Sequence, residues 1–178
     1  MNSFVDTLVP GAIVPSATVE LPLGGTVRCV LVHGFLSASE CEALVQATEQ
    51  RGFATAETDY PSSYRDNDRL LADDPALAGR LFERLMDCAS RMPGLWAVMN
   101  ENDWRMVAVN ERLRFCCYRP GTQFGPHQDG VYHRQNAQSR LTFMVYLNDE
   151  GFSGGETVFF EGRSSAMANQ EAAGCMTP

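Results

Sequence analysis

The apolar residues of the amino-terminal half follow a strand pattern and then a helix pattern. After an irregular lead-in over residues 1–25, a β-branched apolar run at 27–35 predicts a strand. Ser37 and Glu40 then match a capping box, in which two side chains bond to the first free backbone N–H groups of a helix. Because apolar residues recur every three or four positions behind this box, we predict a helix that ends near Arg51.

A second helix is predicted beyond residues 52–73, which form a long polar connection. Asp74 supplies an N-cap, and Pro75 occupies the first helical position, where proline is tolerated. Pro93 and the glycine after it mark the end of this helix. Leucines between these boundaries fall on one helical face, which we interpret as a surface packed in the core.

The pattern changes to short strands in the carboxy-terminal half. Strands are predicted at 113–118, 141–147 and 156–160, with turns at Pro120-Gly121 and Gly154-Gly155 between them. Helices ahead of strands are typical of the α+β class, and several short strands favour a β-sandwich or jelly roll braced by helices.

Composition and charge narrow the classes of function. The 178 residues suit one domain, and the net charge of −8 argues against a nucleic-acid or membrane partner. All 14 basic residues are arginines, which excludes Schiff-base chemistry and a phosphate-loop lysine. The six cysteines form no Cys-x-x-Cys pair, and residues 1–15 do not resemble a signal peptide. We therefore expect free thiols, a reducing cytoplasmic location and no transmembrane segment.

His127 and Asp129 are the leading candidates for catalytic chemistry. Alternate residues of a strand point to the same side, so this imidazole and this carboxylate face one point. Together they are two-thirds of the two-histidine, one-carboxylate set that holds Fe(II). The tripeptide alone is a weak signal, because a polar turn facing water accounts for most such sequences.

The residues around this pair carry a family resemblance. Three blocks follow one another along about fifty residues: Tyr118-x-x-Gly121-x-x-Phe124-x-x-His127-x-Asp129, Tyr146-Leu147-Asn148 and Gly154-Gly155-Glu156-Thr157. In this order they resemble the Fe(II)- and 2-oxoglutarate-dependent dioxygenases of the prolyl 4-hydroxylase type. The three blocks together are far more specific than the tripeptide.

The resemblance implies a fold and an activity. The implied fold is a double-stranded β-helix, a jelly roll, with residues 26–178 as one domain, helical support at about 37–92 and strands at about 106–178. The implied reaction hydroxylates an unactivated C–H bond of a peptidyl proline, an amino acid or a small metabolite, and releases succinate and CO2. Fe(II), 2-oxoglutarate and O2 would take part, with ascorbate as a further candidate cofactor.

The resemblance also implies roles for single residues. His127 and Asp129 match the catalytic pair that binds iron. Tyr118 matches a tyrosine that reaches 2-oxoglutarate, and Tyr146 a residue that helps to hold its distal carboxylate. Each tyrosine can also be read as a core residue with one polar contact.

The polar connection leaves two readings open. Residues 52–73 are either a solvated loop or a lid beside the metal that grips substrate through Arg65, Asn67 and Arg69.

Two further histidines are weaker candidates for metal ligands. His33 is more simply a hydrogen-bonded structural histidine, since nothing beside it supplies a carboxylate partner. His133 is a weak candidate for the third ligand, because in the family the second histidine lies far downstream on another strand.

The chain departs from the family pattern near its end. No histidine follows His133, whereas a complete member carries its distal histidine and a basic residue for the co-substrate on later strands. We expect the second half of the jelly roll to be missing, because the chain is a fragment, half of a split enzyme or a degenerate member. We therefore expect little turnover from this polypeptide alone, and homo-oligomers through unpaired strand edges.

Two other functions stay open. A non-catalytic jelly-roll module with a vestigial metal site predicts no stabilisation by metal. A cupin-like metalloenzyme predicts activity that does not depend on 2-oxoglutarate.

Overall fold

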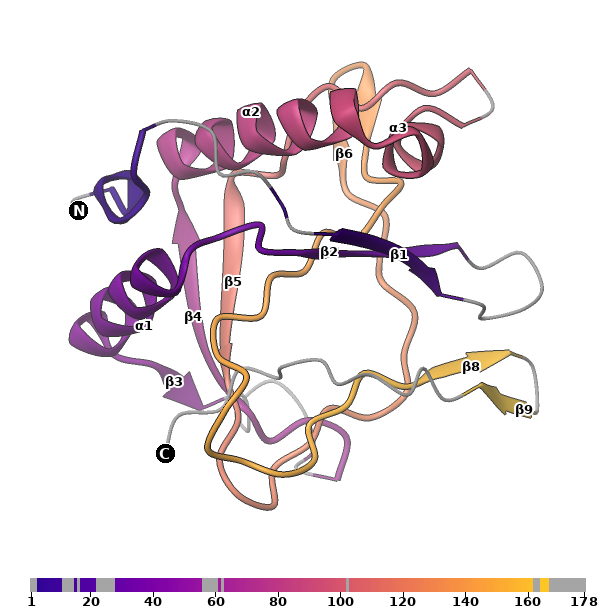
Figure 1. Cartoon of the computed structure of the whole chain (residues 1–178). Helices are drawn as coiled ribbons and strands as arrows, with labels where there is room; N and C mark the ends of the chain where they lie inside the picture. Colours follow the sequence, from indigo (N-terminus) through magenta and orange to yellow (C-terminus); the bar gives the residue numbers. More distant parts are fainter. Residues whose placement is uncertain are drawn as a thin grey trace.

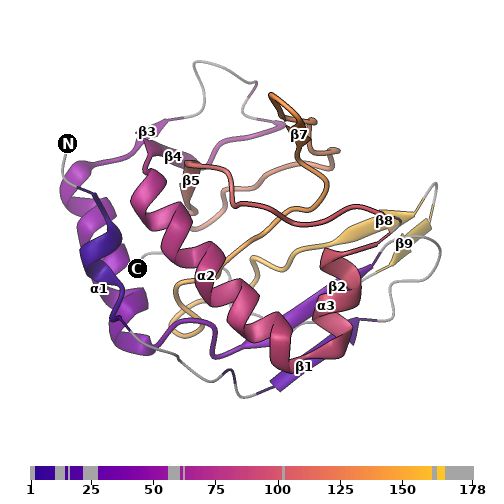
Figure 2. The same cartoon turned by 90° about the horizontal axis from the view of Figure 1, so that it is seen from above.

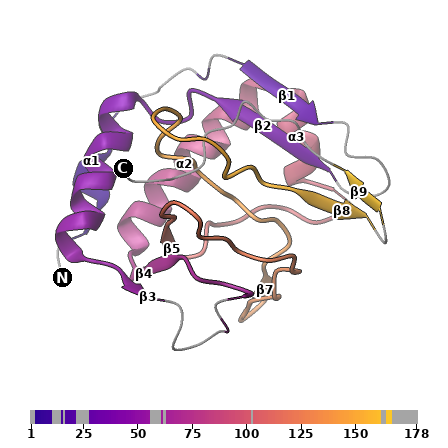
Figure 3. The ribbon, with the colours of Figure 1, turned by 90° about the horizontal axis from the view of Figure 1, so that it is seen from below.

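The computed structural model describes residues 3–10, 15, 17–21, 28–55, 61, 63–101, 103–161 and 164–166. Within these ranges the chain forms a short 3-10 helix, three α-helices and four small antiparallel sheets (Figure 1). From above, α2 (Pro75–Arg91) lies in front, between α1 (Ala38–Arg51) and α3 (Pro93–Met99) (Figure 2). From below, the carboxy-terminal segments lie in front of α2 (Figure 3). In Figure 1, α2 and α3 lie along the top of the molecule and α1 lies at its left.

The helix α1 begins at the predicted capping box. The Ser37 hydroxyl accepts a hydrogen bond from the Glu40 N–H, and the Glu40 carboxylate accepts one from the Ser37 N–H. The helix ends at Arg51, where Gly52 follows with a φ of 79° that favours glycine. Both predicted boundaries of this helix are confirmed.

The helix α2 begins at its predicted N-cap. The Asp74 carboxylate accepts a hydrogen bond from the Leu77 N–H at 3.0 Å, and Pro75 occupies the first turn. The helix stops ahead of Pro93 as predicted, but Pro93 also begins α3. A proline is tolerated there because the first turn of a helix does not use its N–H.

The strands form short antiparallel pairs and one three-stranded sheet. β1 (Ala17–Leu21) pairs with β2 (Cys29–His33), and the larger sheet has the order β3 (Ala54–Thr55), β4 (Asp68–Asp73), β5 (Arg112–Cys117). Two further pairs lie beyond β5: β6 (His133–Arg134) with β7 (Ala137–Gln138), and β8 (Phe159–Glu161) with β9 (Ser164–Ala166). β2, β5 and β8 overlap the strands predicted at 27–35, 113–118 and 156–160.

Two expectations for the amino-terminal half are wrong. The lead-in at 1–25 contains the 3-10 helix η1 (Val5–Thr7) and the strand β1. The polar connection at 52–73 contains β3 and β4, and β4 lies between two neighbouring strands. Its apolar residues are flanked by charged ones, so the run is too short to signal a strand before its partner β5 is known.

The strand predicted at 141–147 is also absent from the described structure. Side chains still alternate there, since Phe143, Val145 and Leu147 pack against the core while Met144 is 53% exposed. The alternation is that of a strand, but a strand also needs a partner for its backbone groups. The described structure therefore has small sheets that are compatible with an incomplete jelly roll, and it does not show the closed fold.

The hydrophobic core joins the helices to the amino terminus. Phe4 is only 1% exposed, and its ring lies 5.0 Å from that of Phe115 in β5. Leu77, Leu81 and Leu85 of α2 are buried in the same cluster, which confirms the interpretation of the leucine stripe as core.

A buried ion pair connects three segments of this core. Arg84 of α2 donates to both carboxylate oxygens of Glu40, at 2.9 and 3.0 Å, and to the carbonyl oxygens of Val9 and Phe35. The side chains of the pair are 3% and 0% exposed. Burial alone would raise the pKa of Glu40, but hydrogen bonds from Arg84, Ser37 and Val9 and the charge of Arg84 lower this pKa to about 2. The carboxylate is therefore ionised in the folded protein.

The described cysteines agree with a further expectation. The five described cysteines are free thiols, and Cys175 lies outside the described residues. Burial raises the pKa of the Cys88 thiol, which keeps it in the neutral form. None of the described helices has the length and apolar character needed to cross a membrane.

Candidate metal centre

His127 and Asp129 lie together in the structure. The Nε2 atom of His127 is 3.4 Å from Oδ1 of Asp129, and the side chains are 32% and 59% exposed. Imidazole nitrogens and carboxylate oxygens bind zinc at about 2.0 to 2.2 Å, so two donors at this separation can share one divalent ion. Both side chains are therefore partly open to solvent.

The backbone fixes the orientation of the His127 ring. Its Nδ1 atom lies 2.9 Å from the carbonyl oxygen of Gly125. A carbonyl oxygen only accepts hydrogen bonds, so Nδ1 is the donor in this contact, and Nε2 is the ring nitrogen that faces Asp129. Metal-binding histidines use the same arrangement, in which the second ring nitrogen donates to an acceptor that orients the ring.

A threonine hydroxyl orients Asp129 in the same way. The Thr142 hydroxyl donates a short hydrogen bond to Oδ2 of Asp129. The other oxygen, Oδ1, faces His127. Each side chain of the pair therefore has one polar atom held by the protein and one directed at the other.

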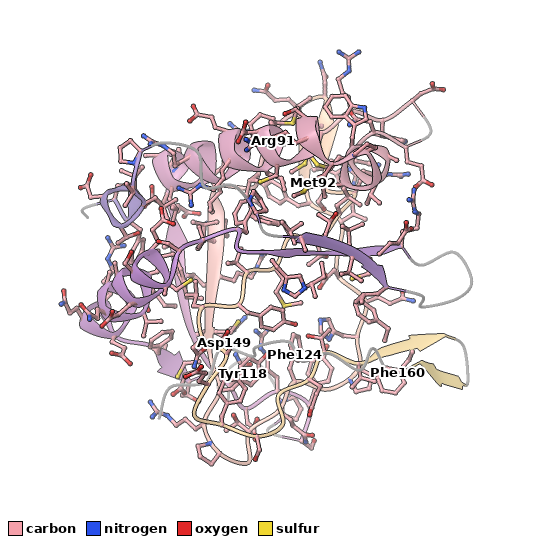
Figure 4. All side chains as sticks on the ribbon, viewed as in Figure 1. Arg91, Met92, Tyr118, Phe124, Asp149 and Phe160 are labelled. Atoms are coloured by element: carbon pink, nitrogen blue, oxygen red, sulfur yellow. The ribbon has the colours of Figure 1, made fainter. Side chains whose placement is uncertain are left out.

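An aromatic and a cationic side chain pack next to His127. The Phe124 ring stacks on the His127 ring, with centroids 3.8 Å apart and planes at 20°. The guanidinium carbon of Arg65 lies 4.0 Å from the centre of the same phenyl ring. Figure 4 shows Phe124 and Tyr118 in the lower half of the molecule, away from α2 at its top.

Two of the three predicted substrate residues are buried. Arg65 is 7% exposed and Asn67 is 0% exposed, and Arg65 Nε donates to Asn67 Oδ1 at 2.7 Å. Arg69 lies in β4, where its backbone pairs with Cys116 of β5. This part of 52–73 is thus not a solvated loop, and substrate binding by the three residues stays a prediction.

The two tyrosines of the family blocks are half-buried. Tyr118 directly follows β5, and Tyr146 shares a short hydrogen bond between its hydroxyl and that of Thr157. This bond joins the Tyr-Leu-Asn block to the Gly-Gly-Glu-Thr block. The contacts of Tyr118 and Tyr146 with 2-oxoglutarate stay predictions.

The described residues do not complete the ligand set. They contain no group of three His, Cys, Asp or Glu side chains that could hold a metal ion. His133 lies in β6 and His33 at the end of β2, and both are exposed. Neither histidine forms a ligand group with His127 and Asp129. The donors of His127 and Asp129 fit a metal ion, and they are two of the three that a two-histidine, one-carboxylate site needs.

Sequence reasoning missed the supporting residues. Phe124 and Gly125 stand inside the first family block, and an aromatic residue three positions ahead of the histidine was the available signal. Thr142 had no such signal, because its contact with Asp129 depends on how the segment at 141–147 folds back.

Comparisons with known proteins bear on the family resemblance of the chain. Residues 113–176 match the family model described as the 2OG-Fe(II) oxygenase superfamily. The chain is also 24% identical over 147 residues to prolyl 4-hydroxylase 5 of Arabidopsis thaliana, a match that covers 79% of this chain and 47% of the relative. The chain thus spans about half the length of the curated relative that it matches. No solved structure matches it. The comparisons confirm the resemblance carried by the three blocks: this chain is similar to the 2OG-Fe(II) oxygenases of the prolyl 4-hydroxylase type.

Proposed function

We propose that this chain supplies the first histidine and the carboxylate of an Fe(II) site in a 2-oxoglutarate-dependent hydroxylase. The observation that carries the proposal is the pairing of His127 Nε2 with Asp129 Oδ1 at 3.4 Å. The second polar atom of each side chain is already engaged, by Gly125 and by Thr142. Donors that are held in one direction before the ion arrives need no rearrangement on binding. The family match over 113–176 supports the same assignment.

The residues of the chain have distinct parts in this proposal. Bound iron and 2-oxoglutarate would supply the oxidising chemistry for hydroxylation of a C–H bond. His127 and Asp129 hold the ion, while Tyr118 and Tyr146 contact the co-substrate. The substrate is a peptidyl proline, an amino acid or a small metabolite, and the name of the plant relative favours a prolyl residue. We also propose that the protein is located in the cytoplasm, where free thiols such as those of the described cysteines persist.

A second candidate function rests on the incomplete ligand set. Because the described residues hold two metal donors and no third, a non-catalytic module with a vestigial site is the competing proposal. The two proposals differ in what metal does to stability. A ligand that binds only the folded state stabilises it by mass action, by roughly 2.7 kcal/mol at a hundredfold excess over its dissociation constant.

Thermal unfolding with Mn(II) as an oxygen-inert substitute for Fe(II) tests the proposal. The purified chain would be unfolded with Mn(II), with 2-oxoglutarate, with both and with neither. We expect the largest rise in Tm with both ligands and no rise in His127→Ala. The matched control is His133→Ala, which removes an exposed histidine and should keep the rise.

Each other outcome points to a different function. No metal-dependent rise would contradict the iron site and favour the non-catalytic module. A rise with Mn(II) that 2-oxoglutarate does not increase would favour a cupin-like metal site. Strong succinate formation by the chain alone would contradict the expectation of low turnover.

A further inference from the structure

The ring of His127 is held by stacking as well as by hydrogen bonding. Its centroid lies 3.8 Å from that of Phe124, with 20° between the planes. Stacking limits rotation of the imidazole about its own bonds, whereas the single contact with Gly125 would still allow the ring to tilt. Phe124 therefore sets the plane in which Nε2 of His127 lies.

Arg65 holds the other face of Phe124. Two planar groups at about 4 Å from one ring centre cannot share a face, so Arg65, at 4.0 Å, lies opposite His127. The guanidinium is fixed in turn, because Nε donates to Asn67 Oδ1 at 2.7 Å and Nη2 lies 3.6 Å from the Cys116 sulfur. Asn67 is fully buried, so this support comes from the interior of the protein.

The backbones of the two segments are joined as well. The Gly125 N–H donates to the Tyr64 carbonyl oxygen at 2.6 Å, and the Gln123 N–H donates to the Asp66 carboxylate at 2.6 Å. Arg65 and Phe124 form an isolated antiparallel bridge between these contacts. The segment at 64–67 thus lies directly beside residues 123–125, which precede His127 in the chain.

We propose that Phe124 and Arg65 are positioning residues for His127, forming a column in which the buried guanidinium fixes the phenyl ring and the phenyl ring fixes the imidazole. The inference rests on the proposed metal role of His127. It gives Arg65 and Asn67 a part in the site that does not depend on contact with substrate. The planar guanidinium is needed because a lysine ammonium has no face to stack on the ring.

Nitrogen-15 NMR of the histidine side chains in the metal-free protein tests the column and does not depend on enzyme activity. The chain has three histidines, and the exposed His33 and His133 serve as references. With all variants in the same buffer at about pH 8, we expect Nδ1 of His127 to be the donor nitrogen, held by the Gly125 carbonyl, and the ring protons to be shifted upfield by Phe124. In Phe124→Leu the His127 signals should move to the averaged tautomer positions of His33 and His133.

Two further variants separate positioning from general stability. Phe82→Leu makes the same change at a half-buried phenylalanine of α2, and it should leave the His127 signals unchanged even if Tm falls. Arg65→Lys keeps the charge and removes the planar face, and it should move the His127 signals in the same direction as Phe124→Leu. In the presence of Mn(II), the Phe124→Leu chain should bind roughly tenfold more weakly.

The outcomes keep the two proposals apart. Unchanged His127 signals in Phe124→Leu would overturn the column, whether or not the wild-type chain binds Mn(II). If the His127 signals change in Phe124→Leu but not in Arg65→Lys, Arg65 is not part of the column. If Mn(II) fails to broaden the wild-type His127 signals, the metal site is wrong, while the tautomer data still decide the column.

Discussion

Thr142 donates a hydrogen bond to Asp129, which lies thirteen residues earlier in the chain. The bond joins the His-x-Asp block to the segment that leads into the Tyr-Leu-Asn block. Tyr146, four residues further on, is bonded to Thr157 of the third block. Two hydroxyl contacts thus hold the three family blocks to one another in their order along the chain.

Removal of the Thr142 hydroxyl should weaken metal binding. Valine has the shape of threonine without the donor, so Thr142→Val leaves Oδ2 of Asp129 without this contact and free to turn. Loss of such an orienting partner typically lowers metal affinity by roughly 10- to 100-fold. We expect a tenfold rise in the Mn(II) dissociation constant, measured by electron paramagnetic resonance of the free ion. Thr142→Ser, which keeps the hydroxyl, should restore most of the affinity, and equal affinity of both variants would show that the bond has no such role.

A methyl group at Gly125 should disturb the site by steric contact. Its Cβ would lie 3.2 Å from the Tyr64 carbonyl oxygen and 3.3 Å from Tyr64 Cδ2. We expect Gly125→Ala to cost about 1 to 3 kcal/mol in the free energy of unfolding, as overpacking does. The control is Gly130→Ala, where an added Cβ meets nothing within 4 Å. Urea unfolding of the two variants would measure the difference, and equal stabilities would contradict the close approach.

Within the helical half, substitution in the buried ion pair should lower the free energy of unfolding most. Glu40→Gln removes the charge that Arg84 faces at 2.9 Å, and a buried charge without its partner costs about 3 to 5 kcal/mol. Glu49→Gln makes the same change at an exposed position of α1 and should alter the free energy of unfolding by less than about 0.5 kcal/mol. A small effect of Glu40→Gln would mean that the pair is more hydrated in solution than the structure shows.

The same carboxylate gives the protein a defined acid sensitivity. The pKa of Glu40 is lowered from 4.5 to about 2 in the folded state, and that of Asp74 is also lowered, because N–H groups of Leu77 and Phe4 and the Ser3 hydroxyl outweigh the effect of burial. A lowered folded-state pKa gives stability that is complete above the unfolded pKa and is lost as the pH falls. We therefore expect the free energy of unfolding to change little because of these groups above about pH 5 and to fall steeply between about pH 4.5 and pH 2.

Glu40→Gln provides the control for that acid dependence. The variant lacks the titrating group, so its curve between about pH 4.5 and pH 2 should be shallower than that of the wild type. Parallel curves for the two proteins would contradict the assignment of the acid sensitivity to Glu40.

Features that depend on neighbouring residues in the chain could be predicted from the sequence. Features that depend on pairing with a distant segment could not. The helix starts at Ser37 and Asp74 were predicted because an N-cap is a local signal, given by Glu40 three positions after Ser37 and by Pro75 directly after Asp74. β4 was missed because its ladder with β5 joins residues that are far apart in the chain. At 141–147 the reverse holds, since the alternation is present and no strand partner lies within the described residues.

The residues of the candidate site also divide into those that could be predicted from the sequence and those that could not. His127 and Asp129 were identified from the two-residue spacing of a strand; the structure assigns no strand to residues 125–132, and the two side chains nevertheless lie 3.4 Å apart. Arg65 was noticed as a polar residue beside the site, but its burial under Phe124 depends on the pairing of 64–66 with 123–125. The second role of Asp74, which accepts hydrogen bonds from Ser3 and Phe4 about seventy residues away, was equally hidden.

The ion pair between Glu40 and Arg84 has a consequence for hydrogen exchange. It ties the amino-terminal segment, the start of α1 and the middle of α2 together, so their amides should open as one cooperative unit and exchange slowest. Residues 142–158, which form no strand in the structure, should exchange much faster. The family blocks would then lie in the half of the molecule that opens most readily, and the binding of a metal or of a partner should first be seen there as slower deuterium uptake.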